Sequence, residues 1–387
     1  MSRTGWILLG LAALAVGLIW FQQGPGGWIS GGSAGDYRVV DGPCGLEFPE
    51  DHGPHPDHKT EWWYYTGNLT GPAGARFGFQ FTFFRHRIVP PAAEADWPEP
   101  RSPWRTAQIY LAHAAVSDID GGRFFQADRV ARGARDISGA ALDGGGAIRI
   151  FLRNWSLDIR GREHRLRADA PELGLNLTLR SQKPPIPHGE DGYSRKGEKR
   201  ESASCYYSLT RLAASGELVP GPGAAPVSVT GEAWMDHEFS SAPLEENLEG
   251  WDWFSLQLDD DTELMVYLLR RKDGGLSAAS SATVVAEDGT ARHVEDDGIS
   301  LEVTDTWESP HTEAVYPAGW RMTVAPAGLE LRISSLLPDQ EMRTDESTGV
   351  SYWEGAVGVE GTRSGQPVSG SGYVELTGYA RDFDAPM

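Results

Sequence analysis

The sequence is poor in basic residues and lacks the motifs of several common enzyme classes. Lys and Arg together number 34 against 55 Asp and Glu, which gives a formal net charge of −21. A chain this acidic repels phosphate backbones, and no compact basic patch offsets the charge, so nucleic acid is excluded as a partner. The sequence has no P-loop and no H-E-x-x-H motif, and the weak Gly-Ser candidates at Gly31 and Gly370 lack the strand–turn–helix context of a nucleophile elbow. A serine hydrolase is therefore disfavoured.

Cysteine is also scarce, with only Cys44 and Cys205 in 387 residues. They are too few for a disulfide framework and too far apart in sequence for a CxxC motif. Two interpretations stay open. In an oxidising compartment the pair would form a single bridge worth about 3–5 kcal/mol by the chain-entropy model. Otherwise both are buried, unpaired thiols, and mass spectrometry with and without reductant separates the two cases.

Charge is absent from residues 5–21, which form an apolar run behind Arg3. As a helix with a rise of about 1.5 Å per residue, this run would span about 26 Å, close to the roughly 30 Å core of a bilayer. No A-x-A cleavage site follows directly, and no cysteine follows for lipidation. We therefore predict that residues 1–35 are an uncleaved signal anchor with a Gly-rich tether, which places the rest of the chain in the periplasm or outside the cell. A cleaved, secreted form is the alternative.

Glycine and tryptophan are abundant, with 47 and 14 residues, and strand-like runs separated by turn signals fill the chain from residue 36 onward. Phenylalanine occupies every second position of residues 77–83, the period of a half-buried strand. Other strand-like runs lie at residues 109–116, 147–152, 173–179, 251–258 and 263–269. No segment has a long helical period, so we predict an all-β chain of antiparallel barrels or sandwiches.

The length of 387 residues favours two domains. A Trp-rich strand start occurs in each half, at residues 61–63 and 251–254, which indicates a faint duplication. We place the domain boundary near residue 240. The prediction is an N-terminal domain of residues 36–240 and a C-terminal domain of residues 241–387.

The sharpest chemical motif is the run GEAWMDHEF at residues 231–239. On a strand, Trp234, Asp236 and Glu238 share one face, and His237 lies on the other. Two carboxylates at this spacing can share a proton, and burial keeps one of them protonated near neutral pH, as a general acid requires. Trp234 beside them would stabilise a developing cation. The alternative is a solvated strand end in which His237 caps a backbone group.

A second motif, DHGPHPDH at residues 51–58, places His52, His55 and His58 among aspartates. These are ligand types for zinc or another borderline metal. However, the His-x2-His-x2-His spacing matches no closed structural site, and two prolines stiffen the segment into a loop. We expect a loop that lies beside a pocket and hydrogen-bonds locally, and we predict neither a metal nor a cofactor.

Aromatic runs are the third feature, at residues 62–65, 77–84, 251–253 and 352–353. Large aromatic side chains at strand spacing usually belong to the core. Several such clusters in one β-rich chain nevertheless favour a lipophilic cavity.

Together these segments resemble the carotenoid 1,2-hydratase (hydroxyneurosporene synthase)-like family, and most closely its exported, lipocalin-like branch, often labelled "predicted secreted hydrolase". The resemblance opens with FPEDHGPHPDHKTEWWYYTG at residues 48–67. It continues through residues 80–85, 203–208, 234–238, 250–254, 264–267, 352–355 and 370–379. It covers nearly the whole chain after residue 40.

The resemblance implies two lipocalin-like β-barrels in tandem, with a lipophilic site in or between them. Hydratases of this family add water to a terminal isoprenoid double bond without a cofactor. An acidic residue protonates the alkene, aromatic side chains hold the carbocation, and water captures it. Related fungal lipocalin-like proteins are polyene cyclases. Members of the exported branch commonly accompany ABC-transporter permeases, which makes such a permease a candidate partner.

Carried onto this chain, the resemblance implies that Asp236 is the proton donor and His237 its partner or the water-positioning base, with Glu238 as a further catalytic candidate. The expected ligand-binding residues are Trp234, Trp251, Trp253, Trp62, Trp63, Tyr64, Glu61 and His52.

Two functions fit these observations. The first is a membrane-tethered hydro-lyase or cyclase that acts on an isoprenoid, polyene or other lipophilic compound. The alternative is a non-catalytic lipid carrier or chaperone accessory to an ABC-type exporter, in which Asp236 and His237 bind a polar head group or join the barrels. A metal hydrolase that uses His52, His55 and His58 is a third, weaker hypothesis.

Overall fold

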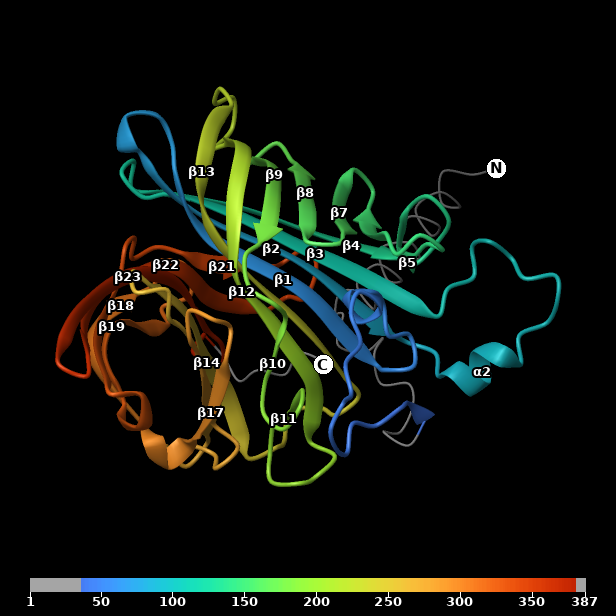
Figure 1. The fold of residues 1–387 in the computed structure, drawn as a ribbon. Coiled ribbons are helices and arrows are strands. Elements are labelled where there is room, and N and C mark those ends of the chain that lie inside the picture. Colours follow the sequence, from blue (N-terminus) through green and yellow to red (C-terminus); the bar gives the residue numbers. More distant parts are fainter. Residues whose placement is uncertain (1–35, 381–387) are drawn as a thin grey trace, which may run out of the picture.

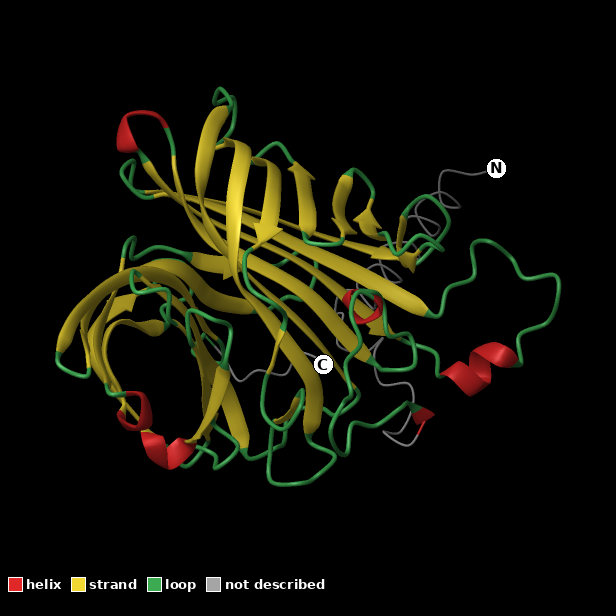
Figure 2. Cartoon of the chain, viewed as in Figure 1, coloured by secondary structure: helices red, strands yellow, loops and turns green. Residues whose placement is uncertain are grey.

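The computed structural model describes residues 36–380, and most of them lie in β-strands (Figures 1 and 2). The expected signal anchor and tether, residues 1–35, lie outside the described residues. Within residues 36–380, the helices are the short α2 (Pro91–Ala95) and four 3₁₀ turns at Glu50–His52, Pro72–Gly74, Asp296–Gly298 and Ala325–Ala327. None of the helices in this part of the chain is long and apolar enough to cross a bilayer. The prediction of an all-β chain is confirmed.

Strands β1 to β13 form one curled antiparallel sheet, with the order β4-β3-β2-β1-β13-β12-β9-β8-β7-β6-β5 and with β10 and β11 paired to β12 (Figure 1). The strands are β1 (Thr60–Thr70), β2 (Arg76–Arg87), β3 (Gln108–Asp118), β4 (Arg123–Arg132), β5 (Ser138–Leu142), β6 (Ile148–Leu152), β7 (Trp155–Arg160), β8 (Glu163–Asp169), β9 (Gly174–Ser181), β10 (Ile186–Pro187), β11 (Tyr193–Arg195), β12 (Ala203–Val219) and β13 (Val227–Ser240).

The remaining strands form a second curled antiparallel sheet, with the order β17-β16-β15-β14-β23-β22-β20-β19-β18 and with β21 paired to β22. They are β14 (Leu248–Leu258), β15 (Glu263–Arg271), β16 (Ser281–Val285), β17 (Ala291–Glu295), β18 (Ile299–Glu308), β19 (Val315–Val324), β20 (Leu329–Ser335), β21 (Glu341–Arg343), β22 (Ser351–Arg363) and β23 (Gln366–Leu376). Both sheets are lipocalin-like barrels, as predicted, and they lie side by side in Figure 2.

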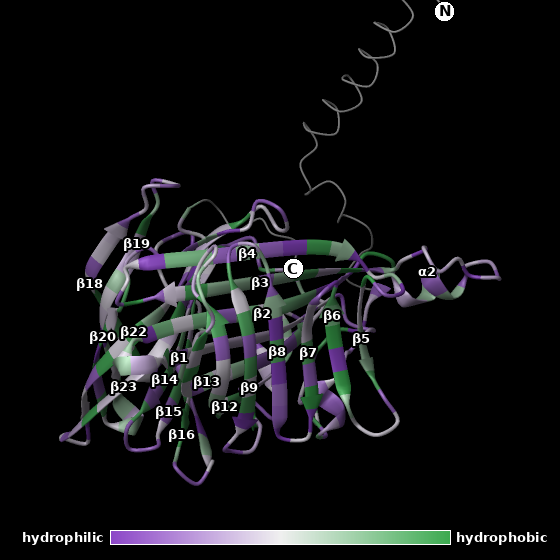
Figure 3. Cartoon of the chain, turned by 90° about the horizontal axis from the view of Figure 1, so that it is seen from above, coloured by the Kyte–Doolittle hydropathy of each residue, from purple (hydrophilic) through white to green (hydrophobic). Residues whose placement is uncertain are grey.

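Each barrel is built from strands whose side chains alternate between two environments. In β8 and β9, buried residues alternate with exposed or half-buried ones, and Figure 3 shows hydrophobic and hydrophilic residues along the same strands. The phenylalanines of residues 77–83 in β2 all point into the core of the first barrel, which confirms the period-two prediction. A second core fills the other barrel, and a third apolar cluster lies between the barrels.

The barrels meet through strands whose outer faces carry polar groups paired across the interface. Asn68 donates to the Gly372 carbonyl at 3.0 Å, and Ser117 donates to Gln340 Oε1 at 2.7 Å. Gly78 allows the close approach, because a Cβ there would lie 3.0 Å from the Cβ of Ala356. The interface is therefore a specific, buried surface.

A β-bulge in β12 places two further polar side chains in the interface. The pairing of β12 with β13 shifts between Leu209 and Leu212, which leaves Thr210 and Arg211 between two core residues. Both side chains donate to Glu263 of β15, Arg211 through Nε at 2.7 Å.

The two cysteines are joined. A disulfide links Cys44, in the segment before β1, to Cys205 in β12. Of the two interpretations left open by the sequence, the structure has the bridge.

Candidate functional site

The motif at residues 231–239 lies in β13, at the centre of the first sheet between β1 and β12. Its alternation sends Trp234 and Asp236 toward the second barrel, while Met235 contributes to the core of the first. His237, the next position on that inner side, contacts Glu61 and Tyr207. The sheet therefore separates Asp236 from His237, and the two residues belong to different clusters.

Asp236 is 4% exposed and accepts three hydrogen bonds. Trp234 Nε1 donates to Oδ1 at 2.6 Å, and Ser208, directly opposite on β12, donates to the same oxygen. The Tyr206 hydroxyl donates to Oδ2 at 2.6 Å. All three groups donate to the carboxyl, so its hydrogen bonds are complete when it is ionised.

A hydrogen-bonded chain leads away from Asp236 through Ser208 to His188. Because Ser208 uses its proton for Asp236, His188 Nε2 donates to the serine oxygen at 2.6 Å. His188 Nδ1, 2.8 Å from Thr283 Oγ1, then accepts from that hydroxyl. Burial, together with the charge of Lys196, holds the pKa of His188 well below its ordinary value, so this histidine is neutral.

Aromatic rings surround this carboxyl on the interface side. Trp253 of β14 donates to the Tyr206 hydroxyl at 3.0 Å, so the second barrel fixes the tyrosine that holds Asp236. Trp234 and Tyr64 contact Trp253 edge to face, with ring centroids 6.4 and 5.2 Å away. Negative ring faces of this kind stabilise a cation placed over them.

Three more carboxyls share this interface, and we call the group of Asp236, Glu238, Glu354 and Glu375 the interface acid cluster. Glu354 on β22 and Glu375 on β23 lie directly opposite each other in their ladder. Glu238 is paired with Lys196 at 3.0 Å. Like charges at opposed strand positions repel each other, so electrostatic repulsion destabilises the cluster when all four groups are ionised.

Burial and the neighbouring charges raise the pKa values of three of these carboxyls. Burial raises the pKa of Asp236 to about 7, against the three hydrogen bonds that lower it. Burial and the charges of Asp236 and Glu238 raise the pKa of Glu375 to about 7, against the hydrogen bond from Trp251. Burial and the charge of Glu375 hold the pKa of Glu354 well above its usual range. Near neutral pH this interface therefore holds protons on carboxylic acids, which is the condition for general acid catalysis.

The other candidates meet inside the first barrel, where Glu61 of β1 is fully buried. Its carboxylate accepts from Arg85 Nε at 2.7 Å, from His55 Nδ1 at 2.8 Å and from His237 Nε2 at 2.9 Å. Burial alone would raise the pKa of Glu61, but Arg85 and the two imidazoles hold it well below the ordinary value. Glu61 is thus the anionic centre of a second group, which we call the barrel histidine cluster (His52, His55, Glu61, Tyr207 and His237).

This cluster continues through Tyr207, whose hydroxyl lies 3.1 Å from His237 Nδ1 and 2.7 Å from His52 Nδ1. Trp63 stacks on the His237 ring, with centroids 4.8 Å apart, and donates to the His52 carbonyl. Burial lowers the pKa of His52 to about 4. In contrast, the hydrogen bonds that His55 donates to Asp51 and Glu61 overcome burial and raise the pKa of His55 to about 9.

The donor atoms of His55, Glu61 and His237 lie within 4.8 Å of one another, a spacing compatible with a metal ion. The surroundings favour an ion-pair network instead. Both His55 ring nitrogens contact carboxylates, and a protonated imidazole has no free lone pair for a metal. Arg85 already neutralises Glu61. The three histidines of the loop also face different partners, with His58 packed beside Phe239.

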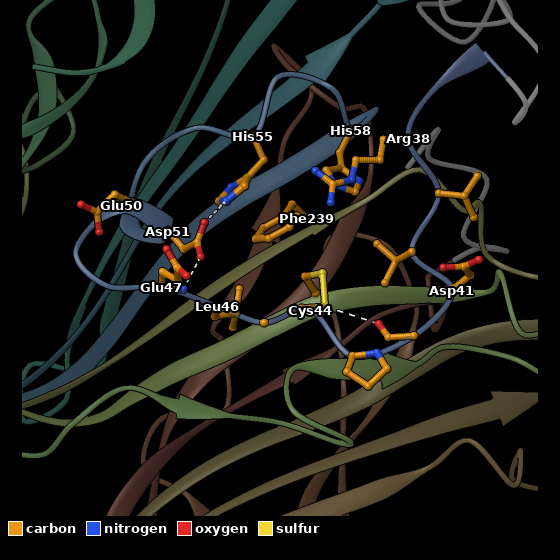
Figure 4. A pocket seen from close by; sticks show the side chains of 16 residues that line it. Arg38, Asp41, Cys44, Leu46, Glu47, Glu50, Asp51, His55, His58 and Phe239 are labelled. Atoms are coloured by element: carbon orange, nitrogen blue, oxygen red, sulfur yellow. Dashed lines mark hydrogen bonds and ion pairs between the residues drawn. A yellow bond between two sulfur atoms is a disulfide. The ribbon is translucent and has the colours of Figure 1, made fainter.

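A cavity of about 280 Å³ lies at the outer side of His55 (Figure 4). Residues 38–47 and 50–51, near the disulfide, form much of its wall, together with His58 and Phe239. Figure 4 shows Asp51 between His55 and the backbone of Glu47, to which it is hydrogen-bonded. His55 therefore connects this cavity to Glu61 in the barrel interior.

The structure thus divides the residues predicted from the sequence between two clusters. The interface holds Asp236, Glu238, Trp234, Trp251, Trp253, Tyr64 and the partly exposed Trp62, and the barrel interior holds His237, Glu61, Trp63 and His52. Sequence reasoning missed Tyr206, Ser208, His188, Lys196, Glu354 and Glu375 as site residues. Most of these residues lie in segments that carry the family resemblance. That location was the one signal in the sequence by which they could have been chosen as candidates.

The fold and the interface define a lipocalin-like double-barrel protein with a buried carboxylic acid set among aromatic rings. A family model described as AttH-like matches residues 39–379, and the chain belongs to this family. The resemblance noted in the sequence is confirmed as a carotenoid hydratase/AttH-like family of lipocalin type. No curated protein matches the chain.

Several solved structures are similar to this chain, and they include the following three. NE1406 of Nitrosomonas europaea, described as a candidate AttH, is 36% identical, with a TM-score of 0.76 over 88% of this chain and 99% of that one. Kievitone hydratase of Nectria haematococca is 14% identical, with a TM-score of 0.65 over 89% and 98%. CghA, solved with Sch210972, is 15% identical, with a TM-score of 0.55 over 88% and 95%. The last two likenesses show the fold alone.

Proposed function

We propose that the protein is a cofactor-independent acid catalyst that adds water to, or cyclises, an unsaturated lipophilic compound, with Asp236 as the proton donor. The observation that carries the proposal is the Asp236 carboxyl, buried beside Trp234 and Trp253, with its pKa raised by burial to about 7. The kievitone hydratase likeness supports the fold needed for such chemistry.

In the hydration step, the Asp236 proton forms a C–H bond with the alkene π electrons, and the more substituted carbon becomes cationic. The remaining carboxylate attracts that charge, and the faces of the neighbouring Trp234 and Trp253 rings would stabilise a cation placed over them. Water then forms the C–O bond, and the proton that it loses restores a carboxyl of the interface acid cluster. The three donors on Asp236 stabilise the carboxylate that the first step leaves behind.

The test uses full-length protein purified from its native host. Lipids that co-purify are identified by mass spectrometry, and the unsaturated ones are incubated with the protein in oxygen-18 water. We expect the label in an alcohol product from the wild type and no label with Asp236→Asn, whereas the exposed-site control Asp305→Asn keeps wild-type turnover. We also expect the rate to fall as pH rises through about 7, because the acid is then deprotonated.

Labelling that persists in Asp236→Asn would dismiss Asp236 as the acid. If the wild type returns every bound lipid unchanged, catalysis is contradicted and the alternative, a lipid carrier that serves an exporter, is favoured. The aromatic cluster between the barrels suits that carrier equally well.

A further inference from the structure

The segment between β2 and β3, residues 88–107, forms a loop that projects away from the barrels (Figures 1 and 2). It contains α2 and five prolines, and most of its residues are exposed. No residue of this loop belongs to the interface acid cluster or to the barrel histidine cluster. None of the steps proposed for Asp236 uses it.

The loop carries two tryptophans, Trp97 and Trp104, that belong to none of the hydrophobic cores of residues 36–380. Trp104 is 59% exposed, and every other aromatic side chain in that range is less exposed. The guanidinium of Arg105 lies 4.4 Å from the centroid of the Trp97 ring, and that of Arg132 lies 5.7 Å from the centroid of the Trp104 ring. Tryptophan and arginine are the side chains that combine an apolar body with a polar end, which suits the headgroup region of a bilayer.

The base of the loop is fixed to the first barrel. The backbone N–H groups of Ile88 and Val89 donate to the Ala107 carbonyl, at 2.8 and 3.3 Å. Arg87, the last residue of β2, donates from Nε to the Val89 carbonyl at 2.8 Å and forms an ion pair with Glu94 of α2. The position of the loop on the barrel is therefore defined by contacts at its two ends.

The same arginine lies where the described chain begins. The Tyr37 hydroxyl donates to the Arg87 carbonyl at 3.2 Å, and Arg87 Nη1 donates to the Pro56 carbonyl at 2.8 Å. The first described residues thus lie beside the base of the projecting loop (Figure 1). The sequence predicts a membrane anchor at residues 5–21, outside the described part of the chain. An anchor that joins the barrel at this point would bring the loop to the bilayer surface.

The charge of the loop indicates the kind of lipid that it fits. Residues 88–107 carry two arginines against three acidic residues, a net charge of −1. Arg87 pairs with Glu94, and Arg101 pairs with Glu99. The whole chain has a net charge of −21, so anionic lipids repel it. Contact through this loop therefore depends on the tryptophans and favours neutral headgroups.

We propose that the loop of residues 88–107 is the surface by which the first barrel docks on a neutral phospholipid bilayer. The exposed Trp104 ring inserts among the headgroups, and Arg132 beside it contacts the phosphate of a zwitterionic lipid. Docking adds to the predicted anchor, because a flexible Gly-rich tether alone lets any face of the barrels meet the bilayer. The proposal is independent of the acid chemistry at Asp236.

Fluorine-19 NMR of full-length protein labelled with 5-fluorotryptophan tests the proposal. The protein is reconstituted in phosphatidylcholine nanodiscs, with and without lipids that carry a nitroxide on the headgroup. The signals of Trp97 and Trp104 are assigned as those missing from Trp97→Phe and Trp104→Phe. We expect both signals to lose most of their height when the nitroxide is present, whereas the signal of the half-buried Trp307 in the second barrel keeps its height.

A matched pair of variants tests whether Trp104 holds the loop at the bilayer. Trp104→Ser should restore the height of the Trp97 signal, and the control Trp307→Ser should not. Adding phosphatidylglycerol to the nanodiscs should not increase the loss of height, because the chain is acidic. Trp104 lies outside the cores of residues 36–380, so its replacement leaves the packing of both barrels intact.

The proposal is overturned if the Trp97 and Trp104 signals keep their height. It is also overturned if the Trp307 signal loses as much, because the barrels would then have no preferred face toward the bilayer, or if the protein does not stay with the nanodiscs. A larger loss with phosphatidylglycerol would overturn the choice of a neutral surface. Oxygen-18 labelling is a separate readout, so failure of this proposal is distinguishable from failure of the proposed function.

Discussion

Replacing Asp236 by Asn should change the free energy of unfolding by an amount that depends on pH. The ordinary pKa of this carboxyl is 3.8, and burial raises it to about 7 in the folded protein. Between about pH 4 and pH 7 the folded protein therefore holds a proton that the unfolded chain has released. Wild-type stability must fall as pH rises through this window, because the unfolded state binds fewer protons there.

The magnitude follows from 1.36 kcal/mol for each unit of pKa. From 3.8 to about 7, the ionised Asp236 weakens the folded state by about 4 kcal/mol above pH 8. Asn does not titrate, so this loss disappears in the variant. At pH 4, where little of this loss has set in, Asn costs about 1–3 kcal/mol because the Tyr206 hydroxyl loses its acceptor. The variant should be less stable than the wild type at pH 4 and equally or more stable at pH 9.

Urea unfolding followed by tryptophan fluorescence, from pH 4 to pH 9, measures this difference. Asp305→Asn, at an exposed position, is the matched control and should follow the wild-type curve throughout. Parallel curves for Asp236→Asn and the wild type would refute the reasoning, because they would mean that Asp236 titrates alike in the folded and unfolded states.

Three further predictions concern other parts of the molecule. Cys44→Ser with Cys205→Ser opens a loop of sequence separation 161 and should lower the free energy of unfolding by about 5 kcal/mol by the chain-entropy model; an unchanged urea midpoint would contradict it. Lys183→Met removes a buried partner of Glu263 and should destabilise by about 3–5 kcal/mol, part of which Glu263→Gln in the same chain restores; an equally stable single variant would argue against the ion pair. Glu61→Gln should lower the pKa of His55 from about 9 toward its ordinary value of 6.5. If the titration of His55 followed by proton NMR is the same in the variant as in the wild type, the two groups do not interact.

Local pattern was enough to predict the strands but not their partners. The phenylalanines at every second position of residues 77–83 predict a half-buried strand because the period of two is a property of the strand itself. The pairing of β1 with β13 joins segments far apart in the chain, and nothing local specifies it. The same holds for His188, which reaches Ser208 from the segment between β10 and β11.

The site shows the same limit. The alternation in residues 234–238 correctly separates Asp236 from His237, yet only the fold shows that the second barrel covers Asp236 and supplies Trp253. Glu354 and Glu375 could not be singled out by local sequence pattern, because only the pairing of β22 with β23 shows that the two carboxyls lie opposite each other. The number of acidic residues in the chain does not reveal which of them are buried together.

The most direct test of the account is the titration of Asp236 itself, read from the carbon-13 shift of its carboxyl in protein labelled on aspartate side chains. The signal is assigned as the one missing from Asp236→Asn. The account predicts a midpoint near pH 7, coupled to the interface acid cluster, with the acid protonated at slightly acidic pH. A midpoint near the ordinary value of 3.8 would contradict the central claim that this interface holds a general acid.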